Sequence, residues 1–244
     1  YVKGDVDFNM PKYISVVGTR NSTEEGKKNC IKLIQGFIEK NHYPVIVSGL
    51  AYGIDICAHR AALDNRLKTI AVFAHGLDRV YPYLHHHIAE KIKHQGALVT
   101  EFCSGTKIDR NFFLRRNRII AGLSDATIVV ESGIKGGALV TADIAHSYNR
   151  DVLTYPGRVS DVYSAGCNML IKSNKAALIQ GADDVEKILN WDVDKTRKKP
   201  LQKILFTDLS NEEETIVDFL KQSGQQSVDT ISLNINMPVS KVSS

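Results

Sequence analysis

Short apolar runs alternate with longer amphipathic stretches along most of the chain. Most of these runs are nearly continuous and rich in β-branched residues, which is typical of strands buried on both faces of a parallel sheet. A turn that carries glycine or small polar residues follows most of the runs. The runs predict strands at Tyr13–Val17, Val45–Val47, Thr69–Ala74, Ala97–Thr100, Ala126–Val130, Val152–Tyr155 and Ala177–Ile179.

The stretches between the predicted strands have helical patterns. Residues Ser22–Glu25 form a capping-box sequence, which predicts the start of a helix. Apolar residues then recur at helical spacing, and a group of alanines predicts a second helix that packs closely on the sheet. These positions are Ile31, Ile34, Phe37 and Ile38 in the first helix, and Ala58, Ala61 and Ala62 in the second. Because strands and helices alternate, we predict an α/β fold with a doubly wound, mostly parallel sheet.

The pattern divides the chain into three parts. Residues 1–191 are the predicted α/β domain, and residues 192–206 are a charged stretch that predicts a basic linker. Residues 207–244 contain an amphipathic helix pattern that begins near Asn211 and a second, shorter pattern over residues 228–235. The chain stops where a third helix would start, so this part is expected to be a partial winged-helix-like domain.

The composition is that of an ordinary globular protein, with 43% hydrophobic and 24% charged residues. The net charge of +4 is too small to predict nucleic-acid binding by itself. A prediction of nucleic-acid binding therefore depends on where the charged residues lie. No apolar run approaches the ~20 residues that a membrane span needs, and the first residues have no signal-peptide pattern. We therefore expect a cytoplasmic protein without membrane contact.

The cysteines and histidines do not predict a metal site. The cysteines are spread far apart without a CxxC pair, so neither a zinc knuckle nor a disulfide framework is expected. They are Cys30, Cys57, Cys103 and Cys167. His85, His86 and His87 are consecutive, and neighbouring helical residues point ~100° apart, so they cannot easily share one ion.

Candidate chemistry gathers where the predicted strands end, the edge at which open parallel sheets bind ligands. Glycine-rich turns that lead into helices expose backbone N–H groups, and the helix dipole favours an anion there. Several such turns together suit a polyanion, and exposed aromatic rings can stack on unpaired bases. The cations at this edge are Arg20, Arg115, Arg116, Arg118, Lys135 and Arg158, and the aromatic residues are Tyr52, Phe112 and Phe113.

Two common nucleotide-binding motifs are absent. The first strand is followed by a single glycine, Gly18, instead of the GxGxxG fingerprint, and no acidic residue ends the second strand to hold a ribose. The chain also has no GxxxxGK[ST] loop, since Lys135 precedes its glycines. Binding of NAD or ATP is therefore disfavoured, and no cofactor is predicted.

Several sequence blocks, in this order, resemble the DNA-processing protein A (DprA/Smf) family. They are Gly18–Arg20, Ser48–Asp55, Gly76–Asp78, Tyr81-Pro82, Phe113–Ser124, Lys135–Ala142, Pro156-Gly157 and Ser164–Ile171. The match spans about residues 13–190. Leu114 replaces a proline of the family pattern, and Gly136 and Ala138 stand at two serine positions, so two possible phosphate-binding hydroxyls are lost.

The resemblance implies an extended Rossmann-like core that binds single-stranded DNA without sequence preference and forms a homodimer. It also implies a role in natural transformation, in which the protein protects incoming strands and loads the RecA recombinase onto them. By the same resemblance, a helical domain would precede Tyr1, and a winged-helix domain would correspond to Asn211–Ser244. The family is not enzymatic, so no catalytic residue is predicted.

The residues predicted to contact DNA share the strand-end turns and the arginine-rich block. They are Gly18, Thr19, Arg20, Ser48, Gly49, Tyr52, Gly53, Phe113, Arg115, Arg116, Asn117, Arg118, Lys135, Gly136 and Gly137. Each also has a structural interpretation. The glycines can serve tight turns and close packing, Phe113 can belong to the core, and one of the arginines can pair with Glu101 or Glu131.

Two other functions stay open. A nucleotide N-glycosidase similar to the LOG-type phosphoribohydrolases would need a placed carboxylate, for which Glu101 and Glu131 are candidates. The LOG block Pro-Gly-Gly-x-Gly-Thr-x-x-Glu is only loosely echoed by Gly136-Gly137 with Thr141 and Asp143. A regulator of duplex DNA would need a recognition helix with base-reading side chains, and the sequence stops before that helix.

Overall fold

The computed structural model describes residues 1–191, 210–224 and 226–243. The chain forms two compact units, Tyr1–Asp192 and Val193–Ser244. The predicted linker, residues 192–206, lies outside the described residues, as do residues 207–209. No described helix has both the length and the apolar character to cross a membrane.

The first unit is built on an eight-stranded sheet with the order β1-β5-β4-β3-β2-β6-β7-β8. The strands from β2 onward pair in parallel. They are β2 (Tyr13–Val17), β3 (Val45–Ser48), β4 (Thr69–Phe73), β5 (Ala97–Thr100), β6 (Ala126–Val129), β7 (Asp151–Thr154) and β8 (Ala177–Leu178). This arrangement confirms the predicted α/β fold with a mostly parallel sheet.

One edge strand has no counterpart among the predicted strands. β1 (Val2–Gly4) pairs antiparallel with β5, with Val2 opposite Val99 and Gly4 opposite Ala97. All three of its residues are exposed, so it lacks the buried apolar run by which the other strands are recognised. β1 forms by pairing with the edge of β5. The paired residues are at least 93 positions apart in the sequence.

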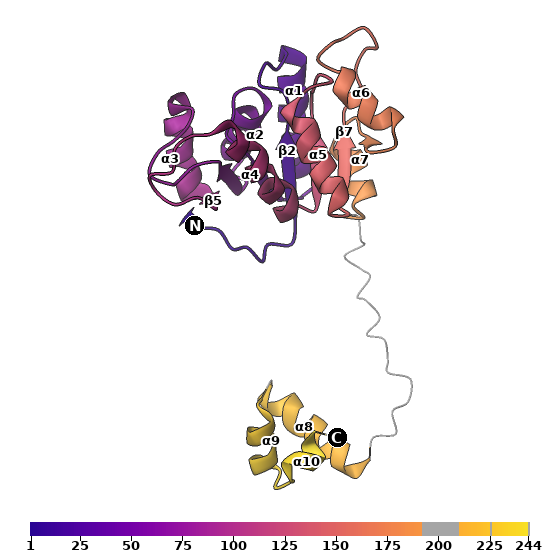
Figure 1. Cartoon of the computed structure of the whole chain (residues 1–244). Helices are drawn as coiled ribbons and strands as arrows, with labels where there is room; N and C mark the ends of the chain where they lie inside the picture. Colours follow the sequence, from indigo (N-terminus) through magenta and orange to yellow (C-terminus); the bar gives the residue numbers. More distant parts are fainter. Residues whose placement is uncertain (192–209, 225, 244) are drawn as a thin grey trace. The chain divides into compact units, whose positions relative to one another are not determined.

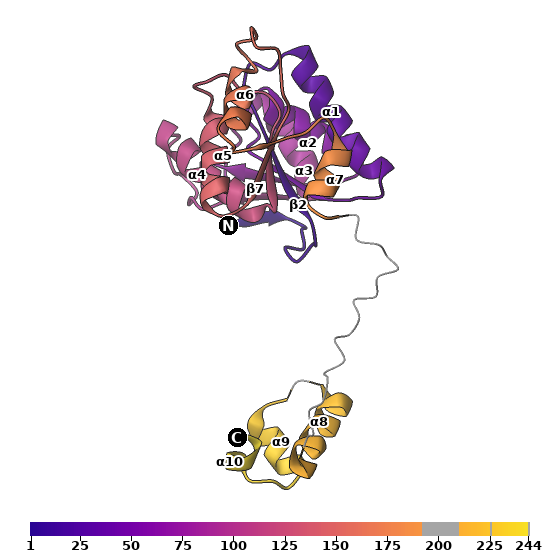
Figure 2. The same ribbon diagram turned by 90° about the vertical axis from the view of Figure 1, so that its right-hand side faces the viewer.

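Helices cover both faces of the sheet, as Figures 1 and 2 show. One layer contains α1 (Glu24–Glu39), α2 (Ile54–Asp64), α3 (His86–Gln95) and α7 (Ala182–Ile188). The other contains α4 (Arg110–Leu123), α5 (Gly137–Ser147) and α6 (Ala165–Lys172). A short 3₁₀ helix, η1 (Tyr83–His85), precedes α3.

The core lies on the two faces of the central strands. In β2, Ile14 and Val16 pack in the cluster shared with α1 and α2, whereas Tyr13 and Val17 pack in the cluster shared with α4 and α5. Successive residues of a strand point to opposite faces, so a strand covered on both sides is mainly apolar. The few buried hydroxyls in these strands bond to neighbouring strands, as those of Ser15, Ser48 and Thr69 do. The burial of both faces explains the nearly continuous apolar runs in the sequence.

The strand order places a switch point beside β2. From β2 the chain first adds β3, β4 and β5 on one side, and then returns to add β6, β7 and β8 on the other. The loops that leave β2 and β6 therefore diverge at the carboxyl edge of the sheet, and such a divergence is where doubly wound sheets bind ligands.

The second unit contains α8 (Asn211–Ser223), α9 (Val228–Asn234) and α10 (Val239–Val242). The capping box at the start of α8 is formed by Ser210 and Glu213, each of which accepts a backbone N–H of the other. Ile231 of α9 is buried within this unit.

Candidate nucleic-acid interface

A pocket of about 610 Å³ lies at the switch point, at the carboxyl edge of the sheet. Its walls come from the end of β2, the loop between β3 and α2, the first turns of α4 and the start of α5. Of the residues predicted to contact DNA, it is lined by Gly18, Thr19, Arg20, Phe113, Arg116, Asn117, Gly136 and Gly137. Tertiary structure thus brings three separate sequence blocks to one pocket.

The other predicted residues lie outside the lining. They are Ser48, Gly49, Tyr52, Gly53, Arg115, Arg118 and Lys135. Ser48 is fully buried, and its hydroxyl donates to the carbonyl oxygen of Val16 at 2.7 Å, which ties β3 to β2. Lys135 is exposed in the turn between β6 and α5, directly before the pocket-lining Gly136.

Gly53 allows two loops at the carboxyl edge to touch. Its φ angle is +76°, and a Cβ at this position would lie 2.1 Å from the carbonyl oxygen of Thr19. The same carbonyl oxygen accepts the backbone N–H of Ile54 at 3.2 Å. A side chain at position 53 would therefore be strained and would push the Thr19-Arg20 turn away from α2.

Arg116 is the buried member of the arginine block. It is 4% exposed, and its Nη1 donates to the carbonyl oxygens of Gly49, at 3.0 Å, and of Val72. A Cβ on Gly49 would lie 2.5 Å from the guanidinium, so the glycine makes room for it. The burial and these bonds favour a structural role for Arg116 over the predicted phosphate contact, because both N–H groups of its Nη1 are bonded to the protein's own backbone.

The electrostatics around Arg116 and Asp55 reflect their burial. Burial lowers the pKa of Arg116 to about 10, although the neighbouring Asp55 opposes the shift. Burial raises the pKa of Asp55, and this is countered by the charge of Arg116 and by the backbone N–H groups of Ala51 and Gly49. The two charges therefore stabilise each other beneath the pocket, and Arg116 stays protonated at neutral pH.

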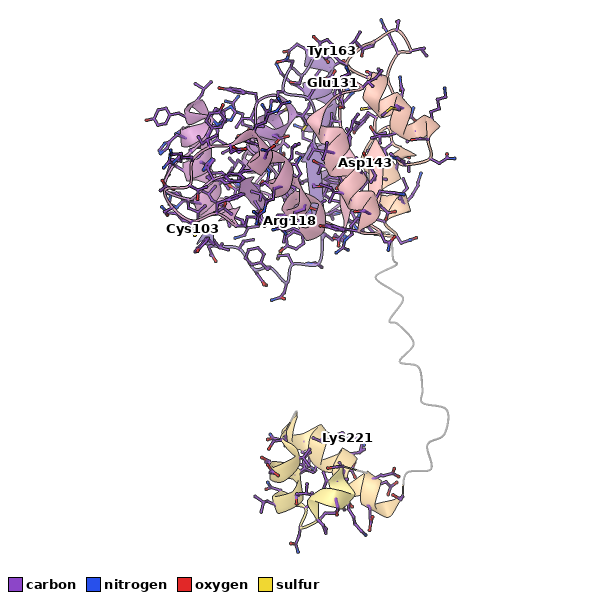
Figure 3. All side chains as sticks on the ribbon, viewed as in Figure 1. Cys103, Arg118, Glu131, Asp143, Tyr163 and Lys221 are labelled. Atoms are coloured by element: carbon purple, nitrogen blue, oxygen red, sulfur yellow. The ribbon has the colours of Figure 1, made fainter. Side chains whose placement is uncertain are left out.

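Arg115 and Arg118 form an ion-paired group with Glu101. Their Nη2 atoms lie 2.9 Å and 2.5 Å from Glu101 Oε2, which is one of the structural interpretations left open by the sequence. Both side chains remain about half exposed, at 59% and 47%. Figure 3 shows Arg118 on α4, apart from the end of the sheet where Glu131 and Tyr163 are labelled.

An exposed cation and two aromatic rings lie together in the pocket wall. The Arg20 guanidinium is 5.7 Å from the centroid of the Phe113 ring, within the range of a cation–π contact. The Tyr81 ring meets Phe113 edge to face, with 5.8 Å between the centroids. Phe113 is half-buried and lines the pocket, so it does not belong to the core.

The start of α5 lines the pocket as an open helix N-terminus. Its N-cap, Gly136, makes no side-chain cap, and Gly136, Gly137, Ala138 and Thr141 all line the pocket. A Cβ on Gly137 would meet no heavy atom within 4 Å, so the first turn of the helix is open to a ligand. Backbone N–H groups and the helix dipole both favour an anion at such a terminus.

Sequence patterns alone missed several pocket residues. Ile108, Arg110, Leu114 and Thr141 line the pocket, and so does Tyr81, which the sequence marks only as part of a family block. Arg110 is the first residue of α4, directly after its N-cap Asp109, and no acidic residue occupies that first turn. A cation at a helix N-terminus is disfavoured by the helix dipole. An arginine at this position in the sequence was therefore the feature that could have marked Arg110 as a candidate binding residue.

The two carboxylates that the sequence offered as glycosidase candidates are engaged elsewhere. Glu131 accepts the backbone N–H of Thr23 at 2.8 Å and its hydroxyl at 2.6 Å, which holds the start of α1. Glu101 binds Arg115 and Arg118. Neither residue lines the pocket, so the glycosidase alternative is not favoured. Within the described residues, no three His, Cys, Asp or Glu side chains are grouped to hold a metal ion.

The sequence comparisons with known proteins agree on one family. The family model of DNA recombination-mediator protein A matches residues 1–190. A putative DNA processing protein DprA from Mycobacterium tuberculosis (strain CDC 1551 / Oshkosh) is 36% identical over 228 residues, which cover 93% of this chain and 58% of the relative. The chain therefore spans less than two thirds of the length of that protein.

Two solved structures are similar to most of this chain. DNA processing protein A from Streptococcus pneumoniae has a TM-score of 0.72 at 39% identity, over 76% of this chain and 64% of that one. DNA processing protein A from Helicobacter pylori, described for its unique single-stranded DNA binding mode, has a TM-score of 0.71 at 30% identity, over 79% and 86%. With the match of the family model, these likenesses show that the chain belongs to the DNA recombination-mediator protein A family.

Proposed function

We propose that this chain binds single-stranded DNA without sequence preference, with the pocket at the switch point as its main contact. The observation that carries the proposal is the composition of that pocket. It combines the open N-terminus of α5, the exposed cation Arg20 and the ring of Phe113 within one cavity. Together these groups match a phosphate and the face of an unpaired base.

The mechanism is positioning, without bond-making. A phosphate binds at the first turn of α5 and Arg20, while Arg110 at the start of α4 offers a second cation. A base stacks beside Phe113 and Tyr81, which meet edge to face. Lys135 lies next to the pocket and serves the neighbouring phosphate of the same strand. Every base has a π-face, so stacking tolerates any sequence.

The preference for single strands follows from the same contacts. Bases in a duplex are stacked on each other and show only their edges, so they cannot place a face against Phe113. An unpaired strand exposes base faces and phosphates together, and both kinds of contact can form at once. A duplex would keep only the phosphate contacts.

The wider role rests on family membership and on the single-stranded DNA binding described for the Helicobacter pylori protein. We propose that the chain acts as a homodimer in the cytoplasm, protects incoming DNA during natural transformation and loads RecA onto it. Dimerisation would join two pockets on one strand and raise the effective affinity. No catalytic step or cofactor is part of this proposal.

The test is a titration of labelled oligo-dT, with a duplex of equal length as the competitor. We expect the single strand to bind more tightly, and we expect Arg20→Ala and Lys135→Ala each to weaken binding. Arg150→Ala is the matched control, because Arg150 is an exposed arginine that directly precedes β7, at the amino edge of the sheet.

Two outcomes would count against the proposal. Negligible binding of oligo-dT by the unmutated protein would exclude the pocket as a DNA site. Equal weakening by Arg20→Ala and Arg150→Ala would show that binding depends on general charge and not on the pocket. Incubation with a purine nucleoside monophosphate, followed by chromatography for the released base, then tests the glycosidase alternative.

A further inference from the structure

A second group of exposed aromatic side chains lies beside the pocket. Tyr83 and Leu84 in η1 are 80% and 77% exposed, and Tyr52, in the loop between β3 and α2, is 45% exposed. His86, the first residue of α3, packs its ring 5.6 Å from that of Tyr83. We call Tyr52, Tyr83, Leu84 and His86 the η1 surface.

A buried histidine holds this surface in place. His85 is 3% exposed, and its Nδ1 lies 2.8 Å from the carbonyl oxygen of Leu50, to which it donates in the Nδ1–H tautomer. The His85 ring also meets Tyr52 edge to face, with 5.0 Å between the centroids. One buried side chain thus joins η1 to the loop after β3, and its contact with Tyr52 pre-organises that ring. Pre-organised rings lose little conformational entropy when a ligand stacks on them.

The η1 surface continues from the pocket. Tyr81 lines the pocket and contacts Phe113, and Tyr83 follows two residues later on the same segment. Tyr52 directly follows Ala51, which also lines the pocket. A strand with one base at Phe113 can therefore reach the η1 surface within its next nucleotides.

The acidic residues at the two ends of the segment are paired. Residues 79–89 include no acidic residue, and Glu90, which follows directly, lies 3.8 Å from His86 and is also bound to Lys93. The nearest acid before it, Asp78, is already paired with Arg79 at 2.8 Å.

We propose that the η1 surface is a second stacking site, which takes bases adjacent to the one in the pocket on the same single strand. This inference rests on the proposed function and adds a site to it. Stacking on Tyr83 supplies affinity to strands that are long enough to span both sites, and it adds nothing to strands that fill only the pocket.

The test compares two lengths of labelled oligo-dT, about 4 and about 16 nucleotides, which span the site sizes of typical single-strand-binding modules. We expect Tyr83→Ala to weaken binding of the longer strand at least about fivefold, the low end for one stacked base, and to leave the shorter strand unchanged. Tyr83→Phe should keep the affinity, because the ring is retained. Tyr43→Ala is the matched control, since Tyr43 is 58% exposed and precedes β3 at the amino edge.

A second readout reports stacking directly. A single 2-aminopurine in the longer strand loses fluorescence when it stacks on a ring, and we expect the loss at one or more positions to disappear in Tyr83→Ala. If Tyr83→Ala binds both lengths as the unmutated protein does, the inference is overturned while the proposed function stands. If Arg20→Ala also leaves both lengths unchanged, the proposed function fails with it.

Discussion

At the residue scale, burial separates two arginines from family-like blocks, and we expect it to give them different roles. Arg20 is exposed at the pocket, whereas Arg116 lies beneath it with its Nη1 bonded to two carbonyl oxygens. Removal of a buried guanidinium that is bonded to backbone oxygens and lies close to a buried carboxylate destabilises the fold. The oxygens and the carboxylate would then be buried without a hydrogen-bond partner or an opposite charge. An exposed guanidinium has no such cost and is free for a ligand.

This contrast predicts opposite effects of two substitutions. Arg116→Met should lower the free energy of unfolding by about 3 kcal/mol, because Asp55 and two carbonyl groups lose a buried cation. Arg20→Ala should leave stability within about 0.5 kcal/mol of the unmutated protein, while it weakens binding of oligo-dT. Urea denaturation and a binding titration on both variants measure the two effects. An Arg116→Met variant of normal stability would show that Arg116 is not structural.

His59 provides a pH-dependent contribution to stability. It is fully buried, and its Nδ1 lies 2.8 Å from the Thr69 hydroxyl, whose own proton goes to the carbonyl oxygen of Ile46. Burial, with the nearby charges of Arg116 and His85, lowers its pKa from 6.5 to about 3. The folded protein therefore requires the neutral ring, and protonation of His59 favours the unfolded state.

The resulting stability is full above pH 6.5 and is lost as the pH falls toward 3. One proton corresponds to about 1.4 kcal/mol for each pH unit. Between pH 7 and pH 5, the unmutated protein should therefore lose about 2 kcal/mol more than His59→Asn, whose amide can still donate to Thr69. Urea denaturation of both proteins at the two pH values measures the difference. Equal losses would mean that His59 does not titrate in this range on unfolding.

At the element scale, helix starts determine what the pocket can bind. The start of α1 is already occupied by a protein carboxylate, since Glu131 accepts from the backbone N–H and the hydroxyl of Thr23. The start of α5 has a glycine cap without a side-chain hydrogen bond, and it lines the pocket. Of these two termini, α5 is therefore the one available to an external anion.

The open start of α5 leads to a prediction in which stability and binding change in opposite directions. Gly137→Asp places a carboxylate in the first turn, where it should maintain or slightly raise stability through the helix dipole. The same charge should repel a phosphate and weaken binding of oligo-dT about tenfold or more. Gly137→Ala is the control, because a Cβ there meets nothing within 4 Å. Unchanged binding by Gly137→Asp would place the phosphate elsewhere.

At the scale of the whole molecule, the strand order brings the segments that line the pocket together. The turn after β2, the first turn of α4 and the start of α5 are far apart in sequence, and they meet because β2 and β6 are neighbours at the switch point. The net charge of +4 is small, so affinity for a polyanion depends on this local grouping and not on a general positive field.

Salt dependence tests how many phosphates the grouped cations contact. For a single strand, the logarithm of the binding constant should fall by about 0.7 per logarithm of salt for each phosphate neutralised. Arg20→Ala should reduce this slope by about 0.7, because one phosphate contact is lost. Titrations of oligo-dT at several salt concentrations measure the slope, with Arg150→Ala as the control. A slope that Arg20→Ala leaves unchanged would show that Arg20 contacts no phosphate.

The sequence by itself predicted the fold class and the seven parallel strands, because most of these strands are buried on both faces and are therefore mainly apolar. It also predicted a binding site at the carboxyl edge of the sheet, since glycines and cations follow the strands. It could not predict β1, whose three exposed residues lack a pattern and depend on the distant edge of β5.

Only the tertiary structure decided which of the similar arginines are buried, which are ion-paired and which line the pocket. Burial separates Arg116 from Arg20, and the ion pairs with Glu101 engage Arg115 and Arg118. Packing also brought Arg110 into the pocket. The burial and the ion pairs of these arginines depend on contacts between segments that are distant in the sequence. Local sequence patterns do not predict which segments come into contact. The physical reason is that hydrophobic periodicity specifies the elements, while packing specifies the neighbours of each side chain.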